Sequence, residues 1–186
     1  LNKINDSQLA HATRDDSPLV RQHALRIVSE LTNPSSDVVQ LAIAGLKDAN
    51  ALVRRAAADA VGQHVDQHSV APLLAALNAT PNEDVHLRHS IMIALKSQLR
   101  AEHAFAKIER LALSKAEQSA LARIALAVPT ADSAAFLLNA MQCGAVDAQT
   151  LKQQLSHIVS YASAESLDQI VELVKTHATK DLDLQV

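Results

Sequence analysis

Histidine is the residue type in this chain whose spacing comes nearest to a chemical site. Nine histidines occur; His64 and His68 are four positions apart, and His86 and His89 are three apart. On a helix, either spacing places both imidazoles on one face, as metal binding requires. His64 and His68, however, straddle an expected turn, and no glutamate completes a His-Glu-x-x-His pattern. Because a zinc site needs three or four converging ligands, the sequence predicts no metal site.

Nucleophilic and cofactor chemistry find little support in the remaining residues. Cys143 is the single cysteine, which excludes an internal disulfide and a thiolate cluster. It precedes Gly144 at an expected helix end, and we expect it to be a small buried side chain. The chain contains neither a Gly-x-Ser-x-Gly elbow nor a glycine-rich phosphate loop. We therefore expect no catalytic residue and no cofactor.

An arginine recurs with a period close to 33 residues, at Arg21, Arg54 and Arg88. A polar turn residue stands six positions before each arginine; these residues are Asp15, Asp48 and Asn82. A row of arginines could hold an anionic ligand, or each could bond to the turn residue of its own or the adjacent unit. Because the polar partner repeats in step, the pattern favours the structural interpretation.

The elements that carry these residues are pairs of helices. A strong N-cap residue stands four positions before each arginine, at Ser17, Asn50 and Asp84. Apolar residues at helical spacing follow, and after a turn a second helix begins. The repeats are clear over 15–113 and degenerate over 114–178, where we expect a helix over 120–128 and a partner capped by Asp132 or Ser133. Residues 7–13 are expected to form a single helix before the first clear repeat.

Composition supports the same architecture. Alanine occurs 34 times and leucine 26 times, whereas glycine occurs 3 times, which favours helix over sheet. One helix pair cannot bury its apolar stripe alone, so neighbouring pairs must stack. The sequence predicts an all-α, right-handed α-α superhelix of about five helix pairs, with 1–186 forming one domain.

Charge and hydropathy exclude two classes of partner. The formal net charge is −3, there is no tryptophan, and no run of five like charges occurs, so binding through phosphate neutralisation is not expected. No apolar stretch approaches the ~20 residues of a membrane span. We expect Lys107 and Arg110, which share a face of a predicted second helix, to lie on a solvated surface.

The string from Asp48 to Gly62 resembles the consensus of HEAT repeats, especially the phycobilisome-lyase type. A narrower likeness covers residues 70–80, 84–89 and 93–100. These are similar to the HEAT section of large exported bacterial proteins, between a dehydrogenase-like β-propeller and a c-type cytochrome domain. The resemblance implies an armadillo-like solenoid from a longer chain, with an exported or periplasmic location. No Cys-x-x-Cys-His motif occurs, so no haem attachment is implied.

The function expected from this pattern is that of a non-catalytic protein-interaction and spacer module within a larger multidomain protein. Its partner is then a protein or a neighbouring domain of the same polypeptide, and a homo-oligomer stays open. The expected binding surface is the inner face formed by the second helices, carrying Gln40, Lys47, Asn78, Lys107 and Arg110. The alternatives are a lyase-type protein that binds a bilin chromophore and a HEAT-like nucleic-acid-binding protein.

Overall fold

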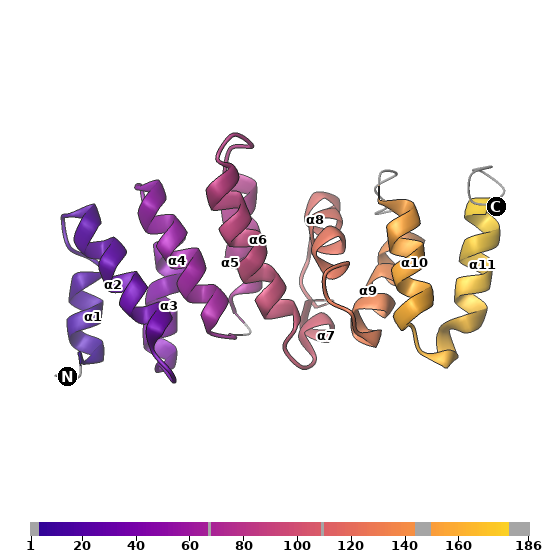
Figure 1. Cartoon of the computed structure of the whole chain (residues 1–186), viewed down its shortest axis with the longest axis horizontal. Helices are drawn as coiled ribbons and strands as arrows, with labels where there is room; N and C mark the ends of the chain where they lie inside the picture. Colours follow the sequence, from indigo (N-terminus) through magenta and orange to yellow (C-terminus); the bar gives the residue numbers. More distant parts are fainter. Residues whose placement is uncertain (1–3, 67, 109, 144–149, 179–186) are drawn as a thin grey trace. The chain divides into compact units, whose positions relative to one another are not determined.

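Helices make up the regular structure of the described part of the chain. The computed structural model describes residues 4–66, 68–108, 110–143 and 150–178, without the side chains of 176–178 (Figure 1). Over these residues it contains eleven α-helices, one 3₁₀ turn and no strand. The predicted all-α class is therefore confirmed, and successive helices pack in adjacent pairs. The chain divides into two compact units, Leu1–Glu102 and His103–Val186, which are called unit 1 and unit 2 below.

Unit 1 consists of two layers of helices. They are α1 (Asp6–Ala12), α2 (Pro18–Glu30), α3 (Ser36–Gly45), α4 (Ala51–Gln63), α5 (Val70–Ala79) and α6 (Val85–Leu99). The first helices of the repeats form one layer, in which α2 packs on α4 and α4 on α6 (Figure 1). The second helices pack on this layer, with α3 against α4 and α5 against α6, and they contact each other far less.

Short polar side chains determine where several of these helices begin. Asn50 Oδ1 accepts from the backbone N–H groups of Leu52 and Val53, and Asp84 Oδ1 accepts from that of Leu87. Both are among the predicted N-caps, and each satisfies amide groups that lack a partner within the helix. Ser17 makes no such side-chain bond within the described residues. There the helix begins with Pro18, whose fixed φ suits the first helical position.

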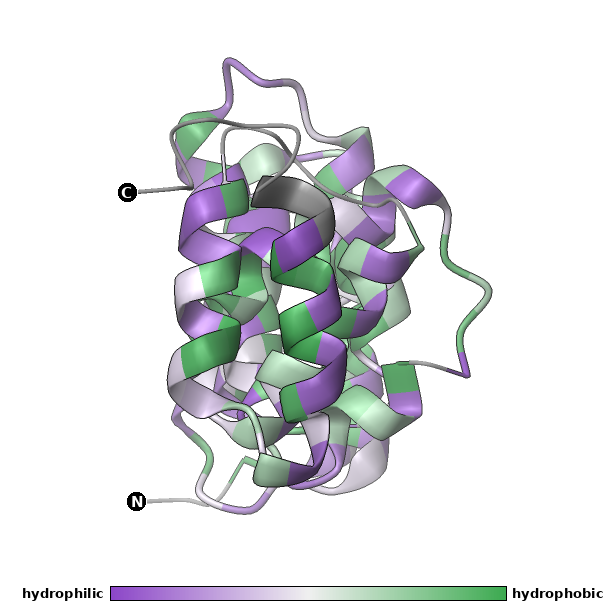
Figure 2. Ribbon diagram, turned by 90° about the vertical axis from the view of Figure 1, so that its right-hand side faces the viewer, coloured by the Kyte–Doolittle hydropathy of each residue, from purple (hydrophilic) through white to green (hydrophobic). Residues whose placement is uncertain are grey.

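Small residues let the helices of unit 1 approach closely. A Cβ added to Gly62 of α4 would lie 3.1 Å from the Cα of Ala94 in α6. A Cβ added to Gly45 of α3 would lie 3.0 Å from the Cβ of Ala57 and from Cδ1 of Leu25. Apolar and polar residues alternate around the individual helices, with the apolar side at the contacts (Figure 2). The core of unit 1 is therefore continuous from one helix pair to the next.

Unit 2 is less regular. Its elements are α7 (Ala104–Ile108), α8 (Lys115–Ala125), α9 (Ala131–Gln142), α10 (Leu151–Tyr161), the 3₁₀ turn η1 (Ala164–Ser166) and α11 (Leu167–Ala178). Packing runs from α8 to α9, from α9 to α10 and from α10 to α11. The rings of Phe105 in α7 and Phe136 in α9 lie 5.3 Å apart between centroids and are tilted by 41°. This aromatic pair joins the short helix α7 to the core of unit 2.

Three expectations for unit 2 were wrong in detail. The helix α8 begins at Lys115 rather than at 120, because Ser114 and Glu117 form a capping box that the sequence analysis did not use. The cap of α9 is Thr130, which accepts from the N–H of Ser133, and not Asp132 or Ser133. The helix α7 ends at Ile108, so the predicted continuation through 112 is absent. The proposed C-terminal residue Gly144 lies outside the described residues.

No helix within the described ranges combines the length and the apolar character needed to cross a membrane.

Candidate functional site

Arg21 is held by a carboxylate of the next repeat. Its Nε atom lies 2.7 Å from Oδ2 of Asp48 and its Nη2 atom lies 2.9 Å from Oδ1. The remaining nitrogen, Nη1, donates to the carbonyl oxygen of Asp15 at 2.8 Å. Only 16% of the Arg21 side chain and 13% of the Asp48 side chain are exposed. This bidentate pair therefore ties the start of α2 to the turn before α4.

The pair also sets the protonation of its members. The hydrogen bond from Arg21 lowers the pKa of Asp48, and the N–H of Asn50, which donates to Oδ1 at 2.8 Å, lowers it further. The same hydrogen bond raises the pKa of Arg21. Both groups are therefore charged over the ordinary pH range, and their charges are directed at each other.

The two later arginines bond to backbone carbonyls instead. Nη1 of Arg54 donates to the carbonyl oxygens of Asp48 at 2.8 Å and of Ala49 at 3.0 Å. Nη1 of Arg88 donates to the carbonyl oxygens of Leu77 at 3.1 Å and of Thr80 at 2.9 Å. Each arginine thus ties the N-terminal part of its helix to the turn that precedes it.

Asn82 is not part of this arrangement. It lies exposed in its turn, and within the described residues no hydrogen bond joins it to Arg54 or Arg88. A neutral amide attracts a guanidinium less than a carboxylate does, so the repeat that carries asparagine in place of Asp48 lacks the side-chain bridge. Of the three polar turn residues, the structure brings only Asp48 to an arginine side chain through its own side chain.

A second set of repeated hydrogen bonds lies at the opposite ends of the same helices. The Nε2 atom of His64 lies 2.7 Å from the carbonyl oxygen of Val28, near the end of α2. One repeat later, Nε2 of Gln98 donates to the carbonyl oxygen of Val61 at 2.7 Å and to that of His64 at 3.1 Å. In return, Oε1 of Gln98 accepts from the N–H of Asp66 at 3.0 Å. These side chains satisfy carbonyl groups that helix ends leave without a partner.

The sequence analysis missed this set, although a signal for it was present. Val28 and Val61 are 33 residues apart, and His64 and Gln98 are 34 apart, so donor and acceptor both follow the register of the arginines. The identity of the donor changes from imidazole to amide, and the position therefore does not stand out as a repeat. What the two residues share is a side-chain N–H of suitable reach.

The histidine pairs do not assemble a metal site in the described residues. His64 is occupied at Val28, whereas His68 is exposed and lies 3.2 Å from Asp66. His86 and His89 are both exposed at the start of α6. No group of three or more histidine, cysteine, aspartate or glutamate residues is placed to hold a metal ion in the part of the chain that is described.

Unit 2 contains a serine and a histidine in contact. Nε2 of His157 in α10 lies 2.8 Å from Oγ of Ser133 in α9, and Oγ also contacts the carbonyl oxygen of Val128. Ser133 has no exposed surface and His157 is 7% exposed. Burial lowers the pKa of His157 and favours its neutral form. Because the hydroxyl can donate to the carbonyl and accept from the imidazole, the pair links α8, α9 and α10 and presents no accessible nucleophile.

The five residues predicted to form a binding surface are all exposed. Gln40 lies in α3, Lys47 just after it, and Asn78 in α5, so these three belong to unit 1. Lys107 lies in α7, and Arg110 follows that helix in unit 2. The prediction that Lys107 and Arg110 share a helical face was wrong, because α7 ends at Ile108.

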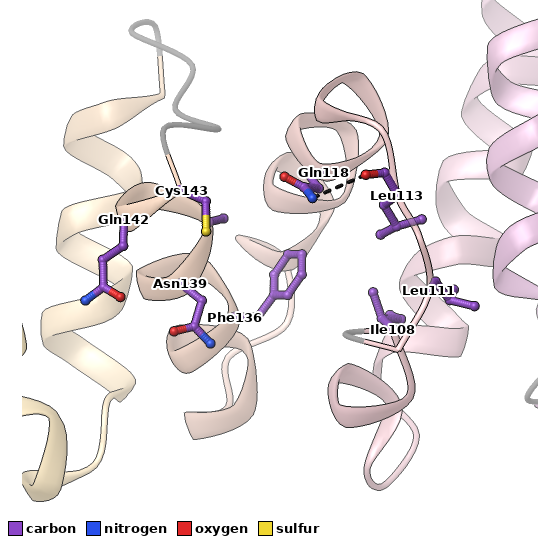
Figure 3. Close-up of a pocket in the computed structure, with 9 residues that line it drawn as sticks. Ile108, Leu111, Leu113, Gln118, Phe136, Asn139, Gln142 and Cys143 are labelled. Carbon is purple, nitrogen blue, oxygen red and sulfur yellow. Dashed lines mark hydrogen bonds between the residues drawn. The ribbon is translucent and has the colours of Figure 1, made fainter.

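A cavity of about 350 Å³ opens in unit 2 beside the end of α9 (Figure 3). Its apolar lining comes from the segment after α7 and from α9, through Ile108, Leu111, Leu113, Phe136 and Ala140. Cys143 also lines it and is exposed, so the expectation of a buried cysteine was wrong. The reason is that Cys143 is the C-cap residue of α9, beyond the buried turns of that helix.

Comparison with known proteins gave one result for the sequence as a family member and none for individual relatives. No curated protein matches the chain. The family model described as HEAT repeats matches residues 7–96. That range contains nearly all of the six helices of unit 1, together with both sets of repeated hydrogen bonds except Gln98 itself. Over residues 7–96, this chain is therefore similar to the HEAT-repeat family.

Proposed function

We propose that this chain is a non-catalytic module for protein interaction and spacing within a larger protein. The observation that carries the proposal is the use of its polar residues in unit 1. Arg21, Asp48, His64 and Gln98 have the side chains most suited to chemistry, and each is engaged in joining helix ends of successive repeats. The same segment matches HEAT repeats, whose general role is that of a scaffold.

The interaction surface that we propose is the second-helix layer. In unit 1, Gln40, Lys47 and Asn78 project from this layer and are exposed. Stacked repeats present such a layer as an extended surface of fixed spacing, which suits binding of another protein. Lys107 and Arg110 are the corresponding candidates in unit 2. The proposed partner is a protein or a neighbouring domain of the same polypeptide.

The two alternatives are less well supported by the residues described. A bilin carries carboxylates, whereas the described residues that line the cavity of unit 2 carry no charge. For nucleic acid, the net charge of −3 gives no basic footprint. The interaction module is therefore the function that we prefer.

The surface can be tested by capturing partners from a lysate of the source cells. The variant Gln40→Ala, Lys47→Ala, Asn78→Ala removes the second-helix candidates of unit 1. A matched control, Arg26→Ala, Arg55→Ala, Gln63→Ala, removes three exposed residues from α2 and α4. We expect the first variant to lose captured proteins that wild type and control retain, while the circular dichroism of all three stays the same. Retention by the first variant together with loss by the control would assign binding to the first-helix layer.

The larger polypeptide is a separate part of the proposal. It rests on the likeness of residues 70–100 to the HEAT section of exported proteins with dehydrogenase-like and cytochrome c domains. Reading the complete open reading frame around this segment tests it. A signal sequence with a β-propeller before the repeats and a Cys-x-x-Cys-His motif after them is the expected result. An open reading frame with no further domain would contradict it.

A further inference from the structure

We propose that the cavity beside Cys143 in unit 2 binds a neutral small molecule with an apolar body of one or two rings. This site is independent of the proposed interaction surface and goes beyond it, because its lining residues all belong to unit 2. The proposal rests on how the cavity is formed, on its size, and on the chemistry of its walls.

The cavity exists because α7 is short. That helix ends at Ile108, and the chain is not helical again until Lys115 begins α8. Leu111 and Leu113 of this non-helical segment form one wall, and Phe136 and Ala140 of α9 form another (Figure 3). A full-length second helix, as in the repeats of unit 1, would place side chains in this volume. Its length in unit 2 therefore leaves a hollow between packed elements.

The cavity has the size of a ligand site and opens to solvent. Its volume of about 350 Å³ falls at the lower end of the range of roughly 300–1,000 Å³ found for small-molecule pockets. Leu111 on its wall is 37% exposed, and Cys143 is exposed as well. A small molecule can therefore reach the cavity without unfolding the core.

The lining determines the chemistry of the ligand. Beyond the five apolar residues, the described lining consists of the side-chain amides of Gln118, Asn139 and Gln142 and the thiol of Cys143. Gln118 Nε2 is directed at the carbonyl oxygen of Leu113, at 3.4 Å (Figure 3). None of these groups carries a charge that could offset the lost hydration of an ionic ligand. The apolar walls therefore favour a neutral molecule, with polar atoms only where it meets the amides.

Phe136 is the residue that favours a ring. Its side chain extends into the space between α9 and the segment that carries Leu113 (Figure 3). The ring is 7% exposed and is held on its other side by Phe105. A fixed aromatic ring in a cavity wall offers a stacking or edge-to-face partner to an aromatic ligand at little entropic cost.

The first experiment uses N-phenyl-1-naphthylamine, a neutral two-ring fluorophore, titrated into the full chain. We expect saturable binding near one molecule per chain. The matched probe 8-anilino-1-naphthalenesulfonate has the same ring systems and an added sulfonate, and we expect it to bind about tenfold or more weakly, equivalent to about 1.4 kcal/mol. Absence of saturable binding by the neutral probe, or equal binding of both probes, would overturn the proposal.

A cavity-filling substitution locates the bound probe. Ala140→Leu adds three methyl-sized groups to a side chain that lines the cavity, whereas Ala135→Leu makes the same change at an exposed position of α9. We expect Ala140→Leu to weaken binding of the neutral probe by about tenfold or more and Ala135→Leu to leave it unchanged. Equal affinity in the two variants would place the probe elsewhere.

Cys143 supplies a second readout that needs no substitution. It is the single cysteine of the chain, so alkylation by iodoacetamide reports on this position alone. We expect saturating N-phenyl-1-naphthylamine to slow alkylation of the wild-type protein severalfold. An unchanged rate at saturation would contradict binding in this cavity, even if Ala140→Leu failed to fold.

Discussion

The imidazole Nε2 of His64 lies 2.7 Å from the carbonyl oxygen of Val28, and the amide Nε2 of Gln98 lies 2.7 Å from the carbonyl oxygen of Val61. The two acceptors occupy the same position in successive repeats, and so do the two donors within one residue. Each bond ties the end of one first helix to the end of the next. Together with the arginines at the other ends, they fix the spacing of α2, α4 and α6 at both edges of the layer.

Gln98 should be the most costly of these polar residues to remove. It is 2% exposed, and Gln98→Ala removes two hydrogen bonds to carbonyls and one from the N–H of Asp66. Because buried groups are left without partners, we expect the free energy of unfolding to fall by about 2–3 kcal/mol in urea denaturation. The control Gln63→Ala, at an exposed position of α4, should change it by less than about 0.5 kcal/mol. Equal effects of the two substitutions would show that the Gln98 bonds contribute nothing.

Asp48 should make unit 1 sensitive to acid. The Arg21 bond lowers its pKa in the folded state, so the folded carboxylate binds its proton less readily than the unfolded one. The contribution to stability is complete above the unfolded pKa of about 4 and is lost as the pH falls through the folded pKa. We expect Asp48→Asn to cost about 1–2 kcal/mol at pH 7 and to flatten the decline of stability below pH ~4.

The measurement for Asp48 is urea denaturation of wild type and variant at pH 7, 5, 4 and 3. Asp59→Asn, at an exposed position of the neighbouring α4, serves as the control for loss of a carboxylate. A wild-type pH profile parallel to that of Asp48→Asn would mean that the ion pair seen in the structure does not stabilise the fold.

His157 should make unit 2 sensitive to pH in a higher range. Burial lowers its pKa, so the folded state binds fewer protons than the unfolded state as the pH falls below about 6.5. The stability contributed by the neutral imidazole is present above that pH and declines towards the folded pKa. We expect hydrogen exchange in α9 and α10 to be faster at pH 5 than at pH 7, after correction for the intrinsic rate.

His157→Gln keeps an N–H donor but does not titrate, so it should remove this pH dependence. His89→Gln, at an exposed position of α6, should leave it intact. If protection in α9 and α10 declined equally in His157→Gln and wild type, another group would be responsible.

Gly62 tests how closely α4 and α6 pack. In an exposed helix, glycine to alanine adds about 1 kcal/mol of stability. Here the added Cβ would lie 3.1 Å from the backbone of Ala94, which cannot rotate away. We expect Gly62→Ala to lower the melting temperature and Gly62→Leu to lower it further. A raised melting temperature for Gly62→Ala would show that the helices have room to separate.

The fold was predictable where one residue type recurs at fixed spacing. The arginine period, the caps at Asn50 and Asp84 and the alanine-rich first helices define the pairs of unit 1 without coordinates. The end of α7 was not predictable, because Leu111 and Ala112 continue the apolar pattern while the chain leaves the helix. Periodicity records which side chains are apolar, and it does not record whether a neighbouring surface is there to bury them.

The candidate sites were predictable only in part, for a related reason. The Arg21–Asp48 bridge joins residues 27 positions apart that repeat in register, and such a pair can be proposed from spacing. The contact of Ser133 with His157 and the cavity near Cys143 depend on how irregular helices of unit 2 pack. Neither follows a repeat, so no spacing in the sequence points to them.

The central claim is that the polar residues of unit 1 connect its repeats and do not form a reactive site. Hydrogen exchange of the full chain, compared between wild type and Gln98→Ala, tests it most directly. If the claim is correct, Gln98→Ala increases exchange at the C-terminal turns of both α4 and α6, two helices of different repeats, by about tenfold or more. Increased exchange confined to α6, with α4 as protected as in wild type, would contradict it.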